Sequence, residues 1–308
     1  MTWTLPSRVA LVAAAALMLG TGAHAQAPAS AAASSSPSAQ RFMPPDEKTL
    51  ANNEFAKVVR RGEEIFIDTG VAARQYTGNS LTCANCHLDA GRRADSAPMW
   101  AAYVSYPAYR GKNKHVNTFA ERVQGCFEYS MNGKPPPLGS ETLVALEAYA
   151  YWLATGAPVN SRMPGAGYPK LKLPAEKADY ARGAAVFAEN CAMCHGADGQ
   201  GQRSNGRTVF PPVWGDRSFN WGAGMAQVGN AAGFIKANMP YGLGGTLSDQ
   251  QAWDAALYID SHERPQDPRF KGSVAQTRTA YHDSADSMYG TVVKGHTLGQ
   301  PGDVGKRP

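Results

Sequence analysis

The 308-residue sequence lacks any long apolar run after its N-terminal segment, and its lysines and arginines are not gathered into one stretch. A membrane-spanning helix needs about 20 consecutive apolar residues, so no membrane span is predicted in the mature chain. The formal net charge is +5, and so mild and dispersed a charge gives no indication of nucleic-acid binding. It is compatible with small anionic substrates or acidic electron-transfer partners.

The N-terminal segment has the pattern of a signal peptide. Arg8 precedes an apolar run from Val9 to Leu19, and the small-residue sequence Ala23-His24-Ala25 follows it. The run is too short to cross a bilayer, whereas a positive start, a brief apolar region and an A-x-A close are typical of a secretory signal. We therefore predict a cleaved signal peptide over residues 1–25, a periplasmic location, and a disordered leader over residues 26–45.

Cysteine is scarce, and its arrangement does not match a disulfide framework. Four of the five cysteines form two C-x-x-C pairs with histidine directly after each, at Cys83-Ala84-Asn85-Cys86-His87 and Cys191-Ala192-Met193-Cys194-His195. C-x-x-C-H is the attachment motif of c-type haem. A thioredoxin-like pair would need no histidine there, and zinc would need two further ligands close by. The sequence therefore predicts two covalently bound haem c groups, with His87 and His195 as proximal iron ligands.

The segments around the two motifs repeat. Arg61-Gly62 precedes Ile65-Phe66, and Arg182-Gly183 precedes Val186-Phe187, each on a predicted amphipathic helix that leads toward the haem motif. After each motif comes a second predicted helix with aromatic residues, over 141–154 and 249–261, with Ser140 and Ser248 as N-caps. This order of helix, haem motif, loop, ligand and helix is typical of class I cytochromes c.

We therefore predict an all-α protein with two class I cytochrome c-like domains in tandem, each enclosing one covalent haem. The first domain is predicted over residues 46–155 and the second over 176–262. A linker rich in proline and glycine over 156–175 joins them. The sequence does not indicate the role of the C-terminal extension over 263–308, nor whether that extension is ordered.

The second haem iron needs a distal ligand, and the candidates are Met225, Met239 and His262. Met239-Pro240 lies just ahead of the last predicted helix, where this fold usually returns a thioether to the iron. Met239 is therefore the favoured ligand, with Met225 as the alternative. Ligation by histidine and methionine gives a comparatively high reduction potential, which suits a site where electrons leave the protein.

For the first haem the candidate distal ligands are Met99, His115, Cys126 and Met131. Cys126 is the one cysteine outside the haem motifs, and it follows His87 at about the spacing at which Met239 follows His195. Iron binds a thiolate well, although a lone cysteine can also be a buried structural thiol or form an intermolecular disulfide. The residues alone leave Cys126 and Met131 as close alternatives.

The stretch from Phe119 to Lys134, FAERVQGCFEYSMNGK, resembles the signature segment of the TsdA-type dihaem thiosulfate dehydrogenases. The resemblance extends over both haem motifs and residues 234–240, and hence over most of residues 50–262. It implies an oxidoreductase that couples two thiosulfates to tetrathionate and passes the electrons to an external cytochrome c; some members catalyse the reverse reaction. It also implies that Cys126 is the distal ligand of the first haem, and that Arg122 and Ser130 lie at the substrate pocket.

The residue types are consistent with this reaction. Two thiosulfate dianions repel each other, and the donor fork of Arg122 is suited to offset their charge; the other candidate cations are Arg92, Arg93, Arg110, Lys112 and Lys134. One departure concerns the lysine that precedes the ligand methionine in some members and exchanges with it. Asn238 occupies that position here, so a ligand switch is not expected.

Two other functions remain open from the sequence. A dihaem electron carrier would have methionine or histidine on both irons and no use for Cys126. A haem subunit of a Sox-type thiosulfate-oxidising complex would act on sulfur bound to a carrier protein.

Overall fold

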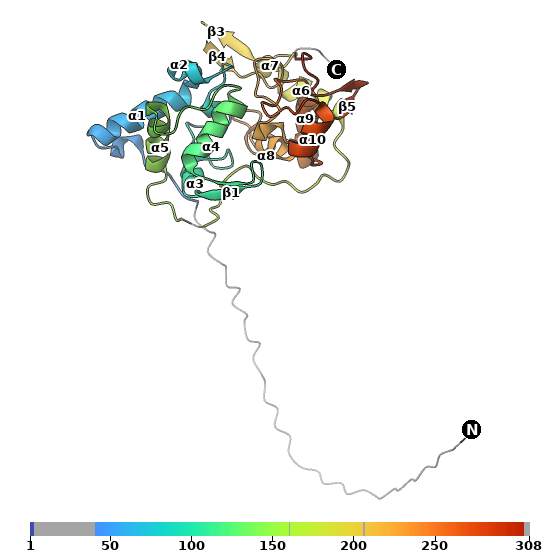
Figure 1. The fold of residues 1–308 in the computed structure, drawn as a ribbon, viewed down its shortest axis with the longest axis horizontal. Coiled ribbons are helices and arrows are strands. Elements are labelled where there is room, and N and C mark those ends of the chain that lie inside the picture. The colour runs from blue at the N-terminus through green and yellow to red at the C-terminus, as the bar shows by residue number, and fades with distance from the viewer. Residues whose placement is uncertain (3–40, 160, 206, 305–308) are drawn as a thin grey trace, which may run out of the picture. The chain divides into compact units, whose positions relative to one another are not determined.

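The computed structural model describes residues 1–2, 41–159, 161–205 and 207–304. The predicted signal peptide, apart from residues 1–2, and most of the predicted leader lie outside the described residues. The features below belong to the compact unit Ala39–Pro308, and Figure 1 shows its helices and strands.

The main elements are helices. In chain order the α-helices are α1 (Glu54–Ile67), α2 (Thr69–Ala72), α3 (Met99–Tyr103), α4 (Phe119–Gly125), α5 (Glu141–Leu153), α6 (Tyr180–Asn190), α7 (Ala192–His195), α8 (Val228–Asn238), α9 (Asp249–Asp260) and α10 (Val274–Tyr281). Short 3-10 turns are η1 (Glu47–Thr49), η2 (Arg74–Tyr76), η3 (Cys83–Asn85) and η5 (Gly224–Ala226), and η4 (Cys126–Ser130) is a single π-helical turn that continues α4.

Three antiparallel two-stranded sheets accompany the helices. They pair β1 (Ala108–Arg110) with β2 (His115–Asn117), β3 (Gln202–Ser204) with β4 (Arg207–Phe210), and β5 (Val292–Val293) with β6 (His296–Thr297). The all-α prediction therefore describes the helical framework and misses these hairpins. Each strand has two to four residues, which is too short for the alternating pattern that identifies a strand in sequence.

In each half, a helix ahead of the haem motif packs on a helix after it, as the repeat predicted. The first pair is α1 with α5 and the second is α6 with α9. The predicted N-caps are confirmed, because Ser140 accepts a hydrogen bond from Leu143 N and Ser248 forms a capping box with Gln251.

The repeated glycines lie where these helices cross. A Cβ atom at Gly62 would overlap the carbonyl oxygen of Ala145, and one at Gly183 would overlap that of Asp254. Only glycine allows two helix backbones to approach so closely, because any side chain would have to occupy the space of the facing carbonyl. The Arg-Gly repeat in the sequence therefore corresponds to the same kind of helix crossing in both halves.

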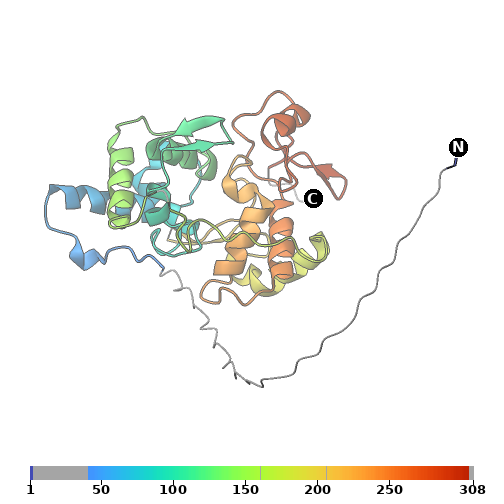
Figure 2. The ribbon, with the colours of Figure 1, turned by 90° about the horizontal axis from the view of Figure 1, so that it is seen from below.

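The described part of the C-terminal extension, residues 263–304, adds to the core. Val274, Tyr289 and Leu298 are buried in the same apolar cluster as Trp100 and Tyr149 of the first half. The extension, drawn in red in Figures 1 and 2, runs beside the orange helices of the second half. Val228 N donates to Asp286 O at 2.8 Å, and Gln227 pairs with Ser287 in an isolated bridge.

The segment between the two halves is bonded to both of them. Gly165 O and Gly167 O accept hydrogen bonds from the amides of Asp95 and Ala97, at 2.8 and 2.9 Å. On the other side, Trp253 Nε1 donates to Lys172 O at 2.9 Å. The predicted linker is thus hydrogen-bonded to both halves, and it lies beside the first haem motif.

Candidate active site

A cavity in the first half brings the first haem motif and the signature segment together. Its volume is about 270 Å³, near the lower end of the roughly 300–1,000 Å³ of ordinary ligand pockets. Cys83, Cys86 and His87 line it, together with residues of α3, α4 and η4. Ala166 and Gly167 of the connecting segment and Phe219 and Met225 of the second half complete the wall.

His87 is held in the form that can bind a metal. Its Nδ1 lies 2.7 Å from Ala97 O, and because a carbonyl oxygen only accepts, Nδ1 carries the proton and Nε2 keeps its lone pair. Burial lowers the pKa of His87 to about 4, so the ring is neutral at pH 7. Burial also raises the pKa values of the Cys83 and Cys86 thiols to about 12.

The second motif has the same local design. His195 Nδ1 lies 2.8 Å from Pro211 O, and burial lowers the pKa of His195. This ring, too, keeps Nε2 free of a proton. Met239 caps the C-terminus of α8, where its amide donates to Ile235 O at 2.9 Å, and it packs against the core of α8 and α9.

Cys126 and Arg122 form a direct pair in the first cavity. The Thr118–Glu121 capping box starts α4, and the π-turn η4 follows without a break. Arg122 Nη1 donates to Cys126 Sγ at 3.0 Å, and the negative charge of a Cys126 thiolate raises the pKa of Arg122. Ser130, the last residue of η4, lines the same cavity. The structure thus brings Arg122, Cys126 and Ser130 together with the first haem motif.

The other predicted candidates separate clearly. Met99 and Met131 line the cavity, whereas His115 is exposed on β2, 3.4 Å from Glu121. Among the five further cations, Arg110 lines the cavity, and its Nη1 donates to the Tyr106 hydroxyl at 2.9 Å. Tyr106 is a cavity residue that the sequence reasoning missed, because a single tyrosine in a loop carries no pattern.

For the second haem, two of the three ligand candidates have further contacts. Met225 lines the first cavity and also packs against the same core of α8 and α9 as Met239. His262 stacks on Trp214 with ring centroids 4.1 Å apart, and its Nδ1 lies 2.7 Å from Tyr258 O. Burial lowers the pKa of His262 to about 4, as expected for a histidine in an apolar core.

The residues fit haem c and do not fit zinc. The first cavity offers two neutral thiols and a histidine with a free Nε2 within a mostly apolar wall, which matches the attachment and proximal ligation of a porphyrin iron. Zinc would require about four nitrogen, sulfur or oxygen ligands in a tetrahedron. Across the described residues, no three His, Cys, Asp or Glu side chains gather in a way that could hold such an ion.

The fold and the site define a c-type cytochrome with two domains, and comparisons with known proteins agree. Residues 72–159 match the family model for the SoxA/TsdA cytochrome c domain, and residues 178–259 match that for cytochrome C oxidase, cbb3-type, subunit III. The thiosulfate dehydrogenase of Thiomonas intermedia (strain K12) is 59% identical over 262 residues, covering 85% of this chain and 83% of the relative. The chain belongs to the thiosulfate dehydrogenase family.

Two further comparisons support this. The thiosulfate dehydrogenase of Stutzerimonas stutzeri (strain A1501) is 54% identical over 84% of this chain and 85% of its own length. The solved structure of thiosulfate dehydrogenase (TsdBA) from Marichromatium purpuratum, in its "as isolated" form, superposes with a TM-score of 0.82 at 53% identity, over 85% of this chain. This chain spans 58% of the length of that solved chain.

Proposed function

We propose that this chain is a periplasmic thiosulfate dehydrogenase that couples two thiosulfates to one tetrathionate. The observation that carries the proposal is the Arg122–Cys126 pair, which lies in the same cavity as the haem-binding residues Cys83, Cys86 and His87. Family membership supplies the substrate class, and the cavity supplies a sulfur atom, a fixed cation and a haem-binding motif in one place.

The proposed chemistry is nucleophilic catalysis by Cys126. The Cys126 thiolate forms a sulfur–sulfur bond to the outer sulfur of one thiosulfate, and two electrons leave. The outer sulfur of a second thiosulfate then attacks the sulfur bonded to Cys126, so that tetrathionate leaves and the thiolate is restored. Two bound haems would each accept one of the electrons.

Arg122 and Ser130 bind and orient substrate in this proposal. The reaction brings two dianions together, and the half-buried guanidinium of Arg122 offsets their repulsion more strongly than a fully exposed one because less water screens it. Arg122 can contact Cys126 through one nitrogen while its remaining donors stay available to an anion. Ser130 adds a neutral hydroxyl donor on the same wall.

We assign different roles to the two halves. In the catalytic half, residues 46–155, His87 and Cys126 would hold the first iron. In the relay half, residues 176–262, His195 and Met239 would hold the second, and the position of Met225 on the first cavity favours Met239. Electrons would pass from the first haem to the second and then to an external cytochrome c. Over the part of the chain that the structure describes, every helix is too short or too polar to span a bilayer.

One observation keeps a second function in view. Met131 is buried and lines the first cavity beside Cys126, so ligation by Met131 would make the protein a dihaem electron carrier. The two functions predict different paramagnetic resonance spectra, because one includes a low-spin His/thiolate signal and the other has two His/Met signals.

The test is an assay of the purified holoprotein with thiosulfate plus an oxidised cytochrome c, and with tetrathionate plus a reductant. We expect Cys126→Gly to keep two haems per chain while tetrathionate formation falls below detection. Met131→Leu should keep the thiolate signal and turnover. Retained turnover in Cys126→Gly, or loss of the low-spin signal only in Met131→Leu, would contradict the proposal.

A further inference from the structure

The π-turn that carries Cys126 is incomplete as a hydrogen-bonded unit. The first two carbonyls of the turn are bonded to residues just after it, since Met131 N donates to Cys126 O and Gly133 N donates to Phe127 O, both at 2.9 Å. The next three carbonyls, of Glu128, Tyr129 and Ser130, receive their hydrogen bonds from residues far away in the chain, Asn220 for the first two and Asn79 for Ser130. Terminal carbonyls of a helical turn need such partners when they are shielded from water.

Asn220, from the second half, supplies two of these hydrogen bonds. Its Nδ2 donates to Glu128 O at 2.9 Å, and its backbone amide donates to Tyr129 O at 3.1 Å. Nδ2 also contacts Asn132 Oδ1 at 3.1 Å, and Oδ1 accepts from Gly222 N at 3.0 Å. Asn220 is 1% exposed. Both polar atoms of its side chain are hydrogen-bonded, Nδ2 to the first half and Oδ1 to the second half.

The Tyr129 side chain is fixed on the same side. Lys112 Nζ lies 3.6 Å from its ring centroid, and the Arg269 guanidinium carbon lies 5.0 Å from it. Lys112 Nζ also donates to Gly222 O, and a Cβ at Gly222 would overlap the Tyr129 ring. The backbone of residues 220–222 therefore lies directly against η4.

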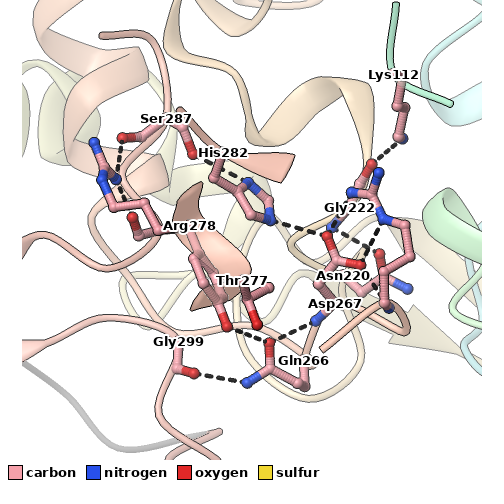
Figure 3. A network of polar contacts seen from close by, with 12 residues as sticks. Lys112, Asn220, Gly222, Gln266, Asp267, Thr277, Arg278, His282, Ser287 and Gly299 are labelled. Carbon is pink, nitrogen blue, oxygen red and sulfur yellow. Dashed lines mark hydrogen bonds and ion pairs between the residues drawn. The ribbon is translucent and has the colours of Figure 1, made fainter. Parts of the chain in front are cut away.

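The C-terminal extension holds this backbone in place. Trp221 N donates to Pro265 O at 3.0 Å, and Arg269 is bonded to Asp267 at 2.6 and 2.9 Å. Asp267 in turn accepts from His282 Nε2 at 2.9 Å. Figure 3 shows Asn220, Gly222 and Lys112 beside Asp267 and His282.

We propose that Asn220 is a positioning residue for Cys126: it holds the carbonyl end of the π-turn, and thereby sets where the Cys126 sulfur lies. The C-terminal extension contributes by fixing the loop that carries Asn220. This inference rests on the proposed function, since it assigns a supporting residue to the proposed nucleophile. Misplacement of a reacting group by about 1 Å can lower a rate about 100-fold, so small movements of η4 matter.

The sharpest variant is Asn220→Asp, which keeps the size of the side chain and the acceptor for Gly222 N. It replaces the donor to Glu128 O by a carboxylate oxygen, which repels that carbonyl. The matched control is Asn230→Asp, because Asn230 Nδ2 also donates to a backbone carbonyl of the second half, Gly224 O, at 2.9 Å. Both holoproteins are compared with the wild type by haem content, paramagnetic resonance and steady-state kinetics.

We expect Asn220→Asp to bind two haems, to shift or broaden the His/thiolate signal, and to lower kcat roughly 10- to 100-fold. The His/Met signal of the second haem and all properties of Asn230→Asp should match the wild type. A wild-type thiolate signal and kcat in Asn220→Asp would overturn the inference, as would equal changes in both haem signals. If Asn220→Asp does not assemble, Asn220→Ser removes the reach to Glu128 O without adding charge, and the same criteria apply.

Failure of the proposed function and failure of the positioning role of Asn220 give different experimental results. A wild-type protein without a thiolate signal or tetrathionate formation contradicts the proposed function itself. A wild-type protein with both, whose Asn220 variants are indistinguishable from it, contradicts only the positioning role.

Discussion

Arg122 donates a hydrogen bond from Nη1 to Cys126 Sγ over 3.0 Å, from one helical turn earlier in the chain. The contact ties the charge of the guanidinium to the position of the sulfur, because both side chains project from the continuous run of α4 and η4. A charge-assisted hydrogen bond of this kind contributes about 1.5–3 kcal/mol. The pair is therefore a suitable place to test the proposed chemistry.

Replacement of Arg122 by lysine should weaken thiosulfate binding while both haems remain attached. Lysine keeps the charge, but it lacks the planar fork that can contact Cys126 and an anion together. Loss of one charge-assisted bond corresponds to a roughly 10- to 100-fold lower kcat/KM. Arg60→Lys, at an exposed position of α1, is the control. An unchanged kcat/KM in Arg122→Lys would show that the guanidinium does not contact substrate.

On the proposal that Met239 is the distal ligand of the second haem, Met239→Leu should lower the reduction potential of that haem, because a thioether ligand favours the reduced iron. Spectroelectrochemistry of the holoprotein measures the potentials of both haems. Met225→Leu is the comparison, because Met225 lines the first cavity. A shifted second-haem potential in Met225→Leu, with none in Met239→Leu, would reverse the assignment.

Gly183→Ala should destabilise the second half, because the added Cβ overlaps the carbonyl oxygen of Asp254 at the crossing of α6 and α9. Overpacking of this kind costs about 1–3 kcal/mol. Gly224→Ala is the control, because it makes the same substitution at a position where a Cβ meets no atom within 4 Å. Denaturant unfolding of the two holoproteins compares them, and equal midpoints would mean that the helix crossing can relax at little cost.

Asp267 gives the protein an acid-sensitive contribution to stability. Burial alone would raise the pKa of Asp267, but hydrogen bonds from His282 and Arg269 outweigh it and hold that pKa well below the ordinary range. A carboxyl with a depressed pKa in the folded state stabilises above its unfolded pKa of about 3.9, and this contribution disappears as the pH falls through the folded pKa.

Asp267→Asn should therefore unfold more easily than the wild type at pH 7, by about 1–3 kcal/mol, and the difference should shrink below about pH 4. Thermal melts at pH 7, 5 and 3 measure it. Asp283→Asn, at an exposed position of the same extension, should match the wild type throughout. A difference that stays constant down to pH 3 would exclude ionised Asp267 as the source.

The sequence was informative where the chemistry depends on neighbouring residues. The C-x-x-C-H motifs and the segment around Cys126 indicated two cytochrome c domains and the thiosulfate dehydrogenase family, and the comparisons confirm both. The caps Ser140 and Ser248 were recognisable because a capping residue acts within its own helical turn.

Contacts between distant residues were not predictable in this way. Asn220 meets Glu128 across 92 positions of chain, and nothing in the residues next to either one signals the contact. Tyr289 and Leu298 enter the core one at a time from an extension without periodicity. Gly62 and Gly183 were visible as a repeat, but their role as crossing points required the structure.

The connecting segment has a consequence for how such a chain can change. The carbonyl oxygen of Ala97 accepts a hydrogen bond from His87 Nδ1, and the amide of Ala97 donates one to Gly167 O. Gly167 itself lines the first cavity. A recombination event at this junction would exchange one cytochrome c domain and would also replace residues that line the cavity of the other domain. The two units are therefore expected to be inherited as a pair, with the joint between them under the same selection as the reaction site.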